Sequence, residues 1–100
     1  MNDGFTIKWT TEASSNLEII SQYILEHWTE EEIRKFYVKL EKQLEILTLF
    51  PTAYPISKKS ENVRRCVFTP SITIYYTIQG NLVVLLSIFD VRQDPEKSLF

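Results

Sequence analysis

Basic and aromatic side chains that could act on a phosphodiester are concentrated in the second half of the sequence. Lys58 and Lys59 lie in a polar segment, Arg64 follows a few residues later, and Tyr76 stands in an apolar run beyond it. An arginine or lysine can stabilise negative charge that develops on a phosphoryl group, and a tyrosine can transfer protons. These residue types suit metal-free RNA cleavage, with Arg64, Lys58, Lys59 and Tyr76 as the catalytic candidates.

Two other interpretations use the same region. Tyr76 could pack in the core while the arginines pair with Glu61 or Asp94, which would be a purely structural role. Bases beside aromatic side chains also suit a surface that binds a nucleic-acid backbone or a protein partner. The candidates for such partner or target contacts are Arg65, Tyr75, Arg92 and Asp94.

The remaining chemistry-bearing residues are too few for other kinds of catalytic site. His27 is the one histidine, and because no nucleophile pattern accompanies it we expect it at an exposed helix end. A closed metal site needs several ligands, so we expect neither a metal nor another cofactor. Gly4 and Gly80 are the two glycines and cannot form a phosphate-binding loop. Cys66 is the one cysteine, which fits a buried apolar role in a reducing compartment.

Length and charge set the broad class of the protein. One hundred residues predict a single domain over 1–100. Residues 1–50 carry nine acids and five bases, whereas residues 51–100 carry six bases and four acids. This asymmetry allows a basic surface on the second half, while the net charge of −2 argues against strong non-specific nucleic-acid binding. The sequence has no signal-peptide pattern and no membrane-spanning apolar run, so we expect a cytoplasmic protein.

Hydrophobic periodicity predicts one strand and two helices in the first half. Residues 5–9 alternate as a half-buried strand. The first helix begins at Thr10 or Thr11, with Ser15 as a competing start, and the second begins at Thr29 with a capping box. Pro51 ends the second helix. Since almost no loop joins the helices, we expect them to form an antiparallel hairpin. Their apolar stripes consist of Ala13, Leu17, Ile20, Ile24 and Trp28, and of Ile33, Phe36, Tyr37, Leu40, Leu44 and Leu47.

Three strands are predicted in the second half, at residues 63–68, 72–78 and 82–91. The last is apolar on both faces, so we expect it inside the sheet, and simple alternation places Leu82, Val84, Leu86 and Ile88 on one face. The fold class is therefore α+β, a β-α-α-β-β-β two-layer sandwich with an antiparallel-type sheet on a helical hairpin. We expect the sheet face away from the helices to be partly open, carrying Thr73, Tyr75 and Thr77 with Arg64 or Arg65.

The order and spacing of these segments resemble those of a known family. The segments are Trp9 to Ile24, Phe36 to Pro51, Val63-Arg64-Arg65, Ile74-Tyr75-Tyr76 and Ile88 to Pro95. Together they are similar to the RelE/ParE superfamily of bacterial type II toxins, in particular its ParE or plasmid-stabilisation branch. The resemblance implies a cognate antitoxin as partner, with operator DNA contacted only indirectly through that antitoxin.

The resemblance also implies which activity to expect. Ribonuclease members of the superfamily use strand arginines, upstream lysines and a tyrosine or histidine near the end. Arg64 and Lys58 or Lys59 match that pattern, whereas Thr73 replaces an arginine and Asp90 stands where many relatives have histidine. The ParE branch resembles proteins that poison DNA gyrase, which requires a binding surface and no nuclease site. We therefore favour gyrase inhibition, with a degenerate messenger-RNA endonuclease or a non-toxic antitoxin-binding remnant as alternatives.

Overall fold

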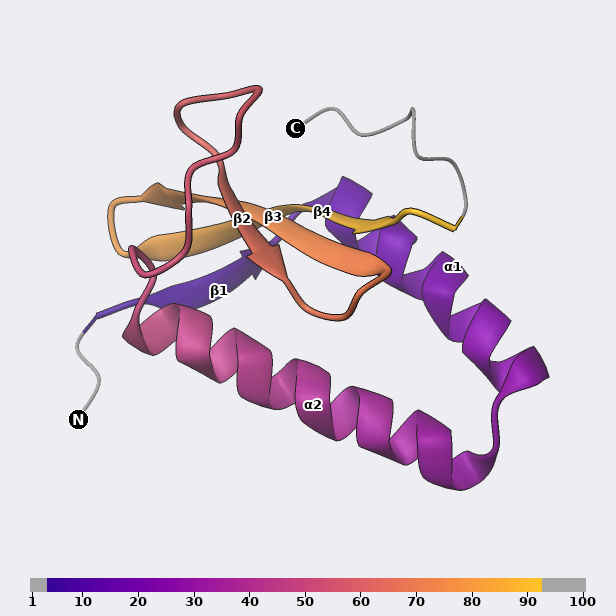
Figure 1. The fold of residues 1–100 in the computed structure, drawn as a ribbon. Coiled ribbons are helices and arrows are strands. Elements are labelled where there is room, and N and C mark those ends of the chain that lie inside the picture. The colour runs from indigo at the N-terminus through magenta and orange to yellow at the C-terminus, as the bar shows by residue number, and fades with distance from the viewer. Residues whose placement is uncertain (1–3, 93–100) are drawn as a thin grey trace.

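A four-stranded sheet and two long helices form the part of the chain that the structure, a computed structural model, describes, residues 4–92 (Figure 1). The elements follow the predicted order: β1 (Thr6–Trp9), α1 (Thr11–His27), α2 (Glu30–Leu49), β2 (Arg64–Val67), β3 (Ile72–Gln79) and β4 (Leu82–Asp90). The α+β fold class is confirmed. Within residues 4–92, neither helix combines the length and apolarity needed to cross a membrane.

Local capping decides where each helix begins. The Thr10 side chain accepts a hydrogen bond from Ala13 N at 3.1 Å, so Thr10 is the N-cap, α1 begins at Thr11 and Ser15 lies inside the helix. Thr29 and Glu32 form the predicted reciprocal capping box at the start of α2, which satisfies two otherwise unpaired amides. The helices meet at Trp28 and diverge from there as an open hairpin (Figure 1).

The strands are ordered β1-β4-β3-β2, so β4 lies inside the sheet as predicted. Pairing is antiparallel between β2, β3 and β4, whereas β1 joins β4 in parallel. The turn between β3 and β4 contains Gly80 with a φ of +58°, a conformation that favours glycine. The sheet is therefore mixed, and its antiparallel part is the hairpin of β3 and β4 together with the edge strand β2.

An irregularity in β4 changes which side chains share a face. Tyr75 pairs with Ser87 and Tyr76 pairs with Leu85, which leaves Leu86 without a partner. Beyond this bulge, Ile88 shares the face of Leu85, so the prediction from simple alternation was wrong. A bulge adds a residue to one strand and reverses the alternation that follows it.

A side chain from α1 stabilises the bulged part of β4. Asn16 Oδ1 accepts hydrogen bonds from Ile88 N at 2.9 Å and from Ser87 Oγ at 3.2 Å. Thr10 Oγ1 also donates to Leu85 O at 2.7 Å. These bonds join the start of α1 to the middle of β4, and no local pattern in β4 could have predicted them.

The core lies between the helices and one face of the sheet. Its buried side chains come from both helices, from β2, β3 and β4, and from the turn after β2: Ala13, Ile20, Ile24, Phe36, Leu40, Leu47, Cys66, Phe68, Ile72, Ile74, Tyr76, Val83, Leu85 and Ile88. Each fully buried large apolar side chain contributes about 1.5–3 kcal/mol. This packing holds β2 and β3, which carry half of the candidate residues, in a fixed relation to α2.

Candidate functional site

Arg64 and Arg65 occupy opposite faces of the sheet. Arg64 pairs with Tyr76 across β2 and β3, and Arg65 pairs with Tyr75. Because Tyr76 belongs to the core, Arg64 lies on the helix side and Arg65 on the other side. The sequence left open which arginine belongs to the outer face, and the register assigns Arg65 to it.

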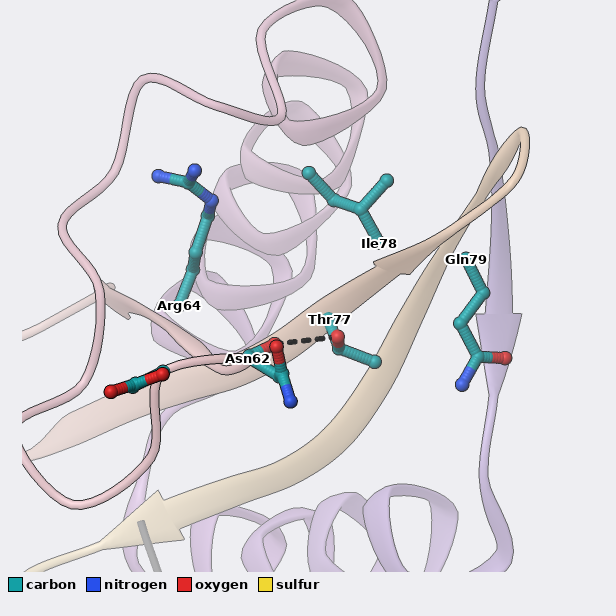
Figure 2. Close-up of a pocket in the computed structure, with 6 residues that line it drawn as sticks. Asn62, Arg64, Thr77, Ile78 and Gln79 are labelled. Carbon is teal, nitrogen blue, oxygen red and sulfur yellow. Dashed lines mark hydrogen bonds between the residues drawn. The ribbon is translucent and has the colours of Figure 1, made fainter.

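The Arg64 side chain binds the chain segment that follows α2. Its Nη1 donates to Tyr54 O at 2.7 Å and to Thr52 O at 3.2 Å. Figure 2 shows the guanidinium group extending away from Asn62 and Thr77 toward this segment. Charge-assisted bonds to two carbonyls fix the segment against the sheet, which is a structural role.

Tyr76 is inaccessible to solvent. Its side chain is 0% exposed, and its hydroxyl donates to Pro51 O at 2.5 Å. Burial raises the pKa of Tyr76 above its ordinary value, and the nearby positive charge of Arg64 offsets this only in part. A buried tyrosine with a raised pKa, bonded to a backbone carbonyl, is poorly suited to accept or deliver a proton on a substrate.

Further buried polar contacts surround Tyr76. Tyr54 packs edge-on against it with ring centroids 6.5 Å apart, and Gln43 Nε2 donates to the Tyr54 hydroxyl at 2.8 Å. Burial raises the pKa of the Cys66 thiol to about 11, although a hydrogen bond with Tyr54 lowers it in part. The thiol is therefore protonated and unreactive at neutral pH, as expected from its position in a strand.

Lys58 and Lys59 lie in the loop beside the outer edge of β2. Both side chains are exposed. The loop is fastened by hydrogen bonds from Ser57 N to Val63 O at 2.6 Å and from Arg65 N to Pro55 O at 2.9 Å. The lysines are thus at the sheet edge and in solvent, separate from the buried hydroxyl of Tyr76.

The outer face of the sheet, which points away from the helices, is less open than the sequence predicted. Tyr75 and Thr73 are only 7% and 9% exposed, so the prediction of an open face was wrong for them. They lie on β3, which pairs with β2 on one side and with β4 on the other. Arg65 is exposed on this face at the β2 edge of the sheet. Lys8 of β1 is also exposed and pairs with Val84 of β4, which pairs in turn with Thr77 of β3. Lys8 and Thr77 therefore lie on the same face as Arg65. We call Lys8, Thr77 and Arg65 the basic face.

Lys8 was not among the sequence candidates. Its alternation with Ile7 and Trp9, which pack against the core, was the signal that could have placed it on the outer face. Its alignment with β4 and β3 could not be read from the sequence, because it depends on the parallel pairing of β1 with β4.

A hollow of about 410 Å³ opens where β3 extends beyond β2. It is lined by Glu61, Asn62, Arg64, Thr77, Ile78 and Gln79 (Figure 2). Thr77 Oγ1 donates to Asn62 O at 2.6 Å, which holds the loop against β3 at one side of the hollow. The volume lies within the usual range of ligand pockets, about 300–1,000 Å³.

The end of β4 is attached to α1 through Arg92. Its Nη2 and Nε donate to the Asp90 carboxylate at 2.7 and 2.9 Å, and its guanidinium lies 5.1 Å from the centre of the Tyr23 ring. Burial raises the pKa of Asp90, but the hydrogen bonds and charge of Arg92 outweigh it, so the pKa lies below its ordinary value. Tyr23 also stacks on the exposed His27, which sits at the helix end as predicted.

These contacts give Arg92 a defined structural partner. Nothing in the local sequence pattern connects Tyr23 of α1 with Arg92. Asp94, another candidate, lies outside the described residues. Among residues 4–92, the structure contains no cluster of three or more side chains suited to hold a metal ion.

Comparisons with known proteins agree with this architecture. The sequence model of a family described as the ParE toxin of the type II toxin–antitoxin system parDE matches residues 7–95. A solved chromosomal ParDE toxin–antitoxin system from P. aeruginosa is similar, with 17% identity, a TM-score of 0.71, and coverage of 86% of this chain and 95% of that chain. A YafQ variant from E. coli has 14% identity, a TM-score of 0.57, and coverage of 89% and 96%.

At these identities the structural likeness establishes the fold alone. No curated protein sequence is significantly similar to the chain.

Proposed function

The chain belongs to the family of ParE toxins of type II toxin–antitoxin systems, and from this membership we propose that it acts by binding DNA gyrase and not by cutting RNA. The ParE branch resembles proteins that poison gyrase. Such an activity requires a surface that recognises the enzyme, and it does not require groups that transfer protons.

The burial of Tyr76 is the observation that carries this proposal. Cleavage of a phosphodiester without a metal needs an accessible group to take or give a proton. The tyrosine that would serve is 0% exposed and bonded to Pro51 O. The neighbouring Arg64 is engaged with two backbone carbonyls. These contacts favour a structural role for both residues.

The basic face is our candidate for the surface that binds the target. Arg65 and Lys8 are exposed on it, and both side chains are long enough to reach a partner. Exposed charges mainly steer association and set specificity. We therefore expect replacement of either base to slow association with an acidic surface of the target.

A cognate antitoxin completes the proposed system. Membership in a type II toxin family implies such a partner. We propose that operator DNA is contacted only through the antitoxin, since the net charge of −2 gives this chain little affinity for DNA on its own. The proposal places the toxin in the cytoplasm, where gyrase acts.

The proposal is tested with purified protein in two parallel assays. The first follows supercoiling by gyrase, and the second follows cleavage of message bound to ribosomes. We expect the wild type to inhibit supercoiling, Arg65→Ala to weaken inhibition about tenfold, and no RNA cleavage. Thr48→Ala, on the surface of α2, serves as the control.

Other outcomes separate the alternatives. Cleavage of ribosome-bound message that is lost in Arg64→Ala would establish a nuclease in place of a gyrase inhibitor. Activity in neither assay, together with normal growth when the protein is induced without an antitoxin, would leave a non-toxic antitoxin-binding protein.

A further inference from the structure

The strand β1 has one free edge, on the side away from β4. It is the first strand in the sheet order, so β4 is its one neighbouring strand in the part of the chain that the structure describes (Figure 1). Thr6 N donates to Asn81 O at 3.0 Å, and Thr10 N donates to Leu85 O at 3.3 Å. The main-chain groups of these even-numbered residues therefore point to β4. Successive residues direct these groups to opposite sides of a strand, so the N–H and C=O of Ile7 point away from the sheet.

The outward main-chain groups of β1 have no partner among residues 4–92. No hydrogen bond within this range uses the N–H or C=O of Ile7 or the N–H of Trp9, since the ladder to β4 uses the alternate residues. Such groups at a sheet edge are a template for pairing with another strand.

The two faces of β1 carry different side chains at this edge. Phe5, Ile7 and Trp9 are partly buried and pack against the core, so each retains some exposed apolar surface. Thr6 and Lys8 are exposed on the outer face. A lysine on a short edge strand discourages pairing with strands of arbitrary sequence. The edge is therefore suited to a partner strand that places no positive charge opposite Lys8.

We propose that the free edge of β1 binds the same edge of a second copy of the chain, antiparallel about a twofold axis at Ile7. The two Ile7 residues exchange N–H···O=C bonds, and Trp9 N–H of each copy donates to Phe5 C=O of the other. A twofold contact uses the same surface on both copies. The two four-stranded sheets become one continuous sheet, with both helical hairpins on one side and both basic faces on the other.

The side chains of β1 are complementary to themselves in this register. On the inner face Phe5 lies opposite Trp9 of the second copy, and the two Ile7 side chains lie opposite each other. Aromatic and β-branched pairs of this kind stabilise neighbouring strands. On the outer face Lys8 lies opposite Thr6, and the two lysines are diagonal neighbours about 7–8 Å apart, where salt screens part of their repulsion. A register centred on Lys8 would place the two lysines directly opposite each other.

The proposal concerns self-association and does not depend on gyrase inhibition. It is tested by sedimentation equilibrium of the purified full chain between about 10 μM and about 1 mM. We expect a monomer–dimer equilibrium with a Kd of about 100 μM, because a strand of four residues forms a small interface. Hydrogen exchange of the Ile7 amide should be fast in dilute protein and slower as the dimer fills.

Oppositely charged substitutions at Thr6 test the register. Thr6→Glu places a carboxylate opposite Lys8 in two equivalent pairs and should tighten the dimer about fivefold, whereas Thr6→Lys opposes like charges and should weaken it about fivefold. The matched controls are Val67→Glu and Val67→Lys, at a 53% exposed position on the other edge strand, and they should leave the Kd unchanged. Urea unfolding checks that each variant is folded.

Several results would overturn the proposal. A chain that remains monomeric at about 1 mM, or an Ile7 amide protected equally at every concentration, would exclude pairing at this edge. Weakening by both Thr6 variants would indicate a register with Thr6 opposite itself, and no effect of either would place the contact elsewhere. A Kd that changes with the Val67 variants instead would assign the dimer to the β2 edge.

Discussion

The side chains of Arg64 and Arg65, which are neighbours in the sequence, lie on opposite faces of the sheet. One is half-buried and binds the carbonyls of Thr52 and Tyr54, and the other is exposed. Adjacent residues in a strand always point to opposite faces. The register therefore separates two residues of the same chemistry into a structural role and a surface role.

Replacement of these arginines should have different effects on stability. Arg64→Ala should lower the free energy of unfolding by about 1–2 kcal/mol, because two backbone carbonyls lose a charged donor. Arg65→Ala should change it by no more than about 0.5 kcal/mol, as for most exposed positions. Urea unfolding of both variants measures the difference, and equal losses would contradict the assignment of Arg64 as a structural residue.

Tyr76→Phe should separate stability from activity. The substitution keeps the ring but removes the hydroxyl that donates to Pro51 O, so we expect a loss of about 1–2 kcal/mol in urea unfolding. Inhibition of gyrase per folded molecule should be unchanged, since the buried hydroxyl does not reach a target. A variant that folds as well as the wild type but has lost its activity would show that the hydroxyl acts in function.

Asp90→Asn should alter how stability depends on pH. The pKa of Asp90 lies below its ordinary value in the folded protein, because the bonds and charge of Arg92 outweigh its burial. An unfolded aspartate titrates near pH 4. The pair therefore stabilises the fold fully above about pH 4, and this contribution is lost as the pH falls through the lower folded value.

Urea midpoints at pH 7 and pH 3 measure this effect. We expect Asp90→Asn to be less stable than the wild type by about 1–2 kcal/mol at pH 7, with a smaller difference at pH 3. Glu31→Gln is the control, because the Glu31–Arg34 pair is about 60% exposed on each side and exposed pairs contribute little. A difference for Asp90→Asn that stays constant with pH would contradict the ion-pair contribution.

Much of the fold was predictable because its signals are local. A capping residue such as Thr29 acts within one helical turn, and Pro51 ends a helix through its own ring. The apolar character of both faces of β4 required an interior position in the sheet. The faces of β3 were also assigned correctly from alternation alone, because no bulge lies within that strand.

The candidate site was less predictable because it depends on residues far apart in the sequence. Tyr23 meets Arg92 only after α1 packs beside β4. Tyr75 is buried, which no property of Tyr75 itself could indicate. The end of β3 extends beyond β2, because β2 begins at Arg64 opposite Tyr76, and that follows from pairing between strands.

The sequence by itself determined the element order, the start of the second helix, the α+β class and the resemblance to the toxin family. These follow from periodicity, capping and spacing, which act over a few residues. The tertiary structure alone decided which arginine faces the core, where Asn16 stabilises the bulge in β4, and that the Tyr76 hydroxyl is bonded to Pro51 O. The physical reason is that strand register and burial are set by packing between distant segments, and they fix the chemistry available to each side chain.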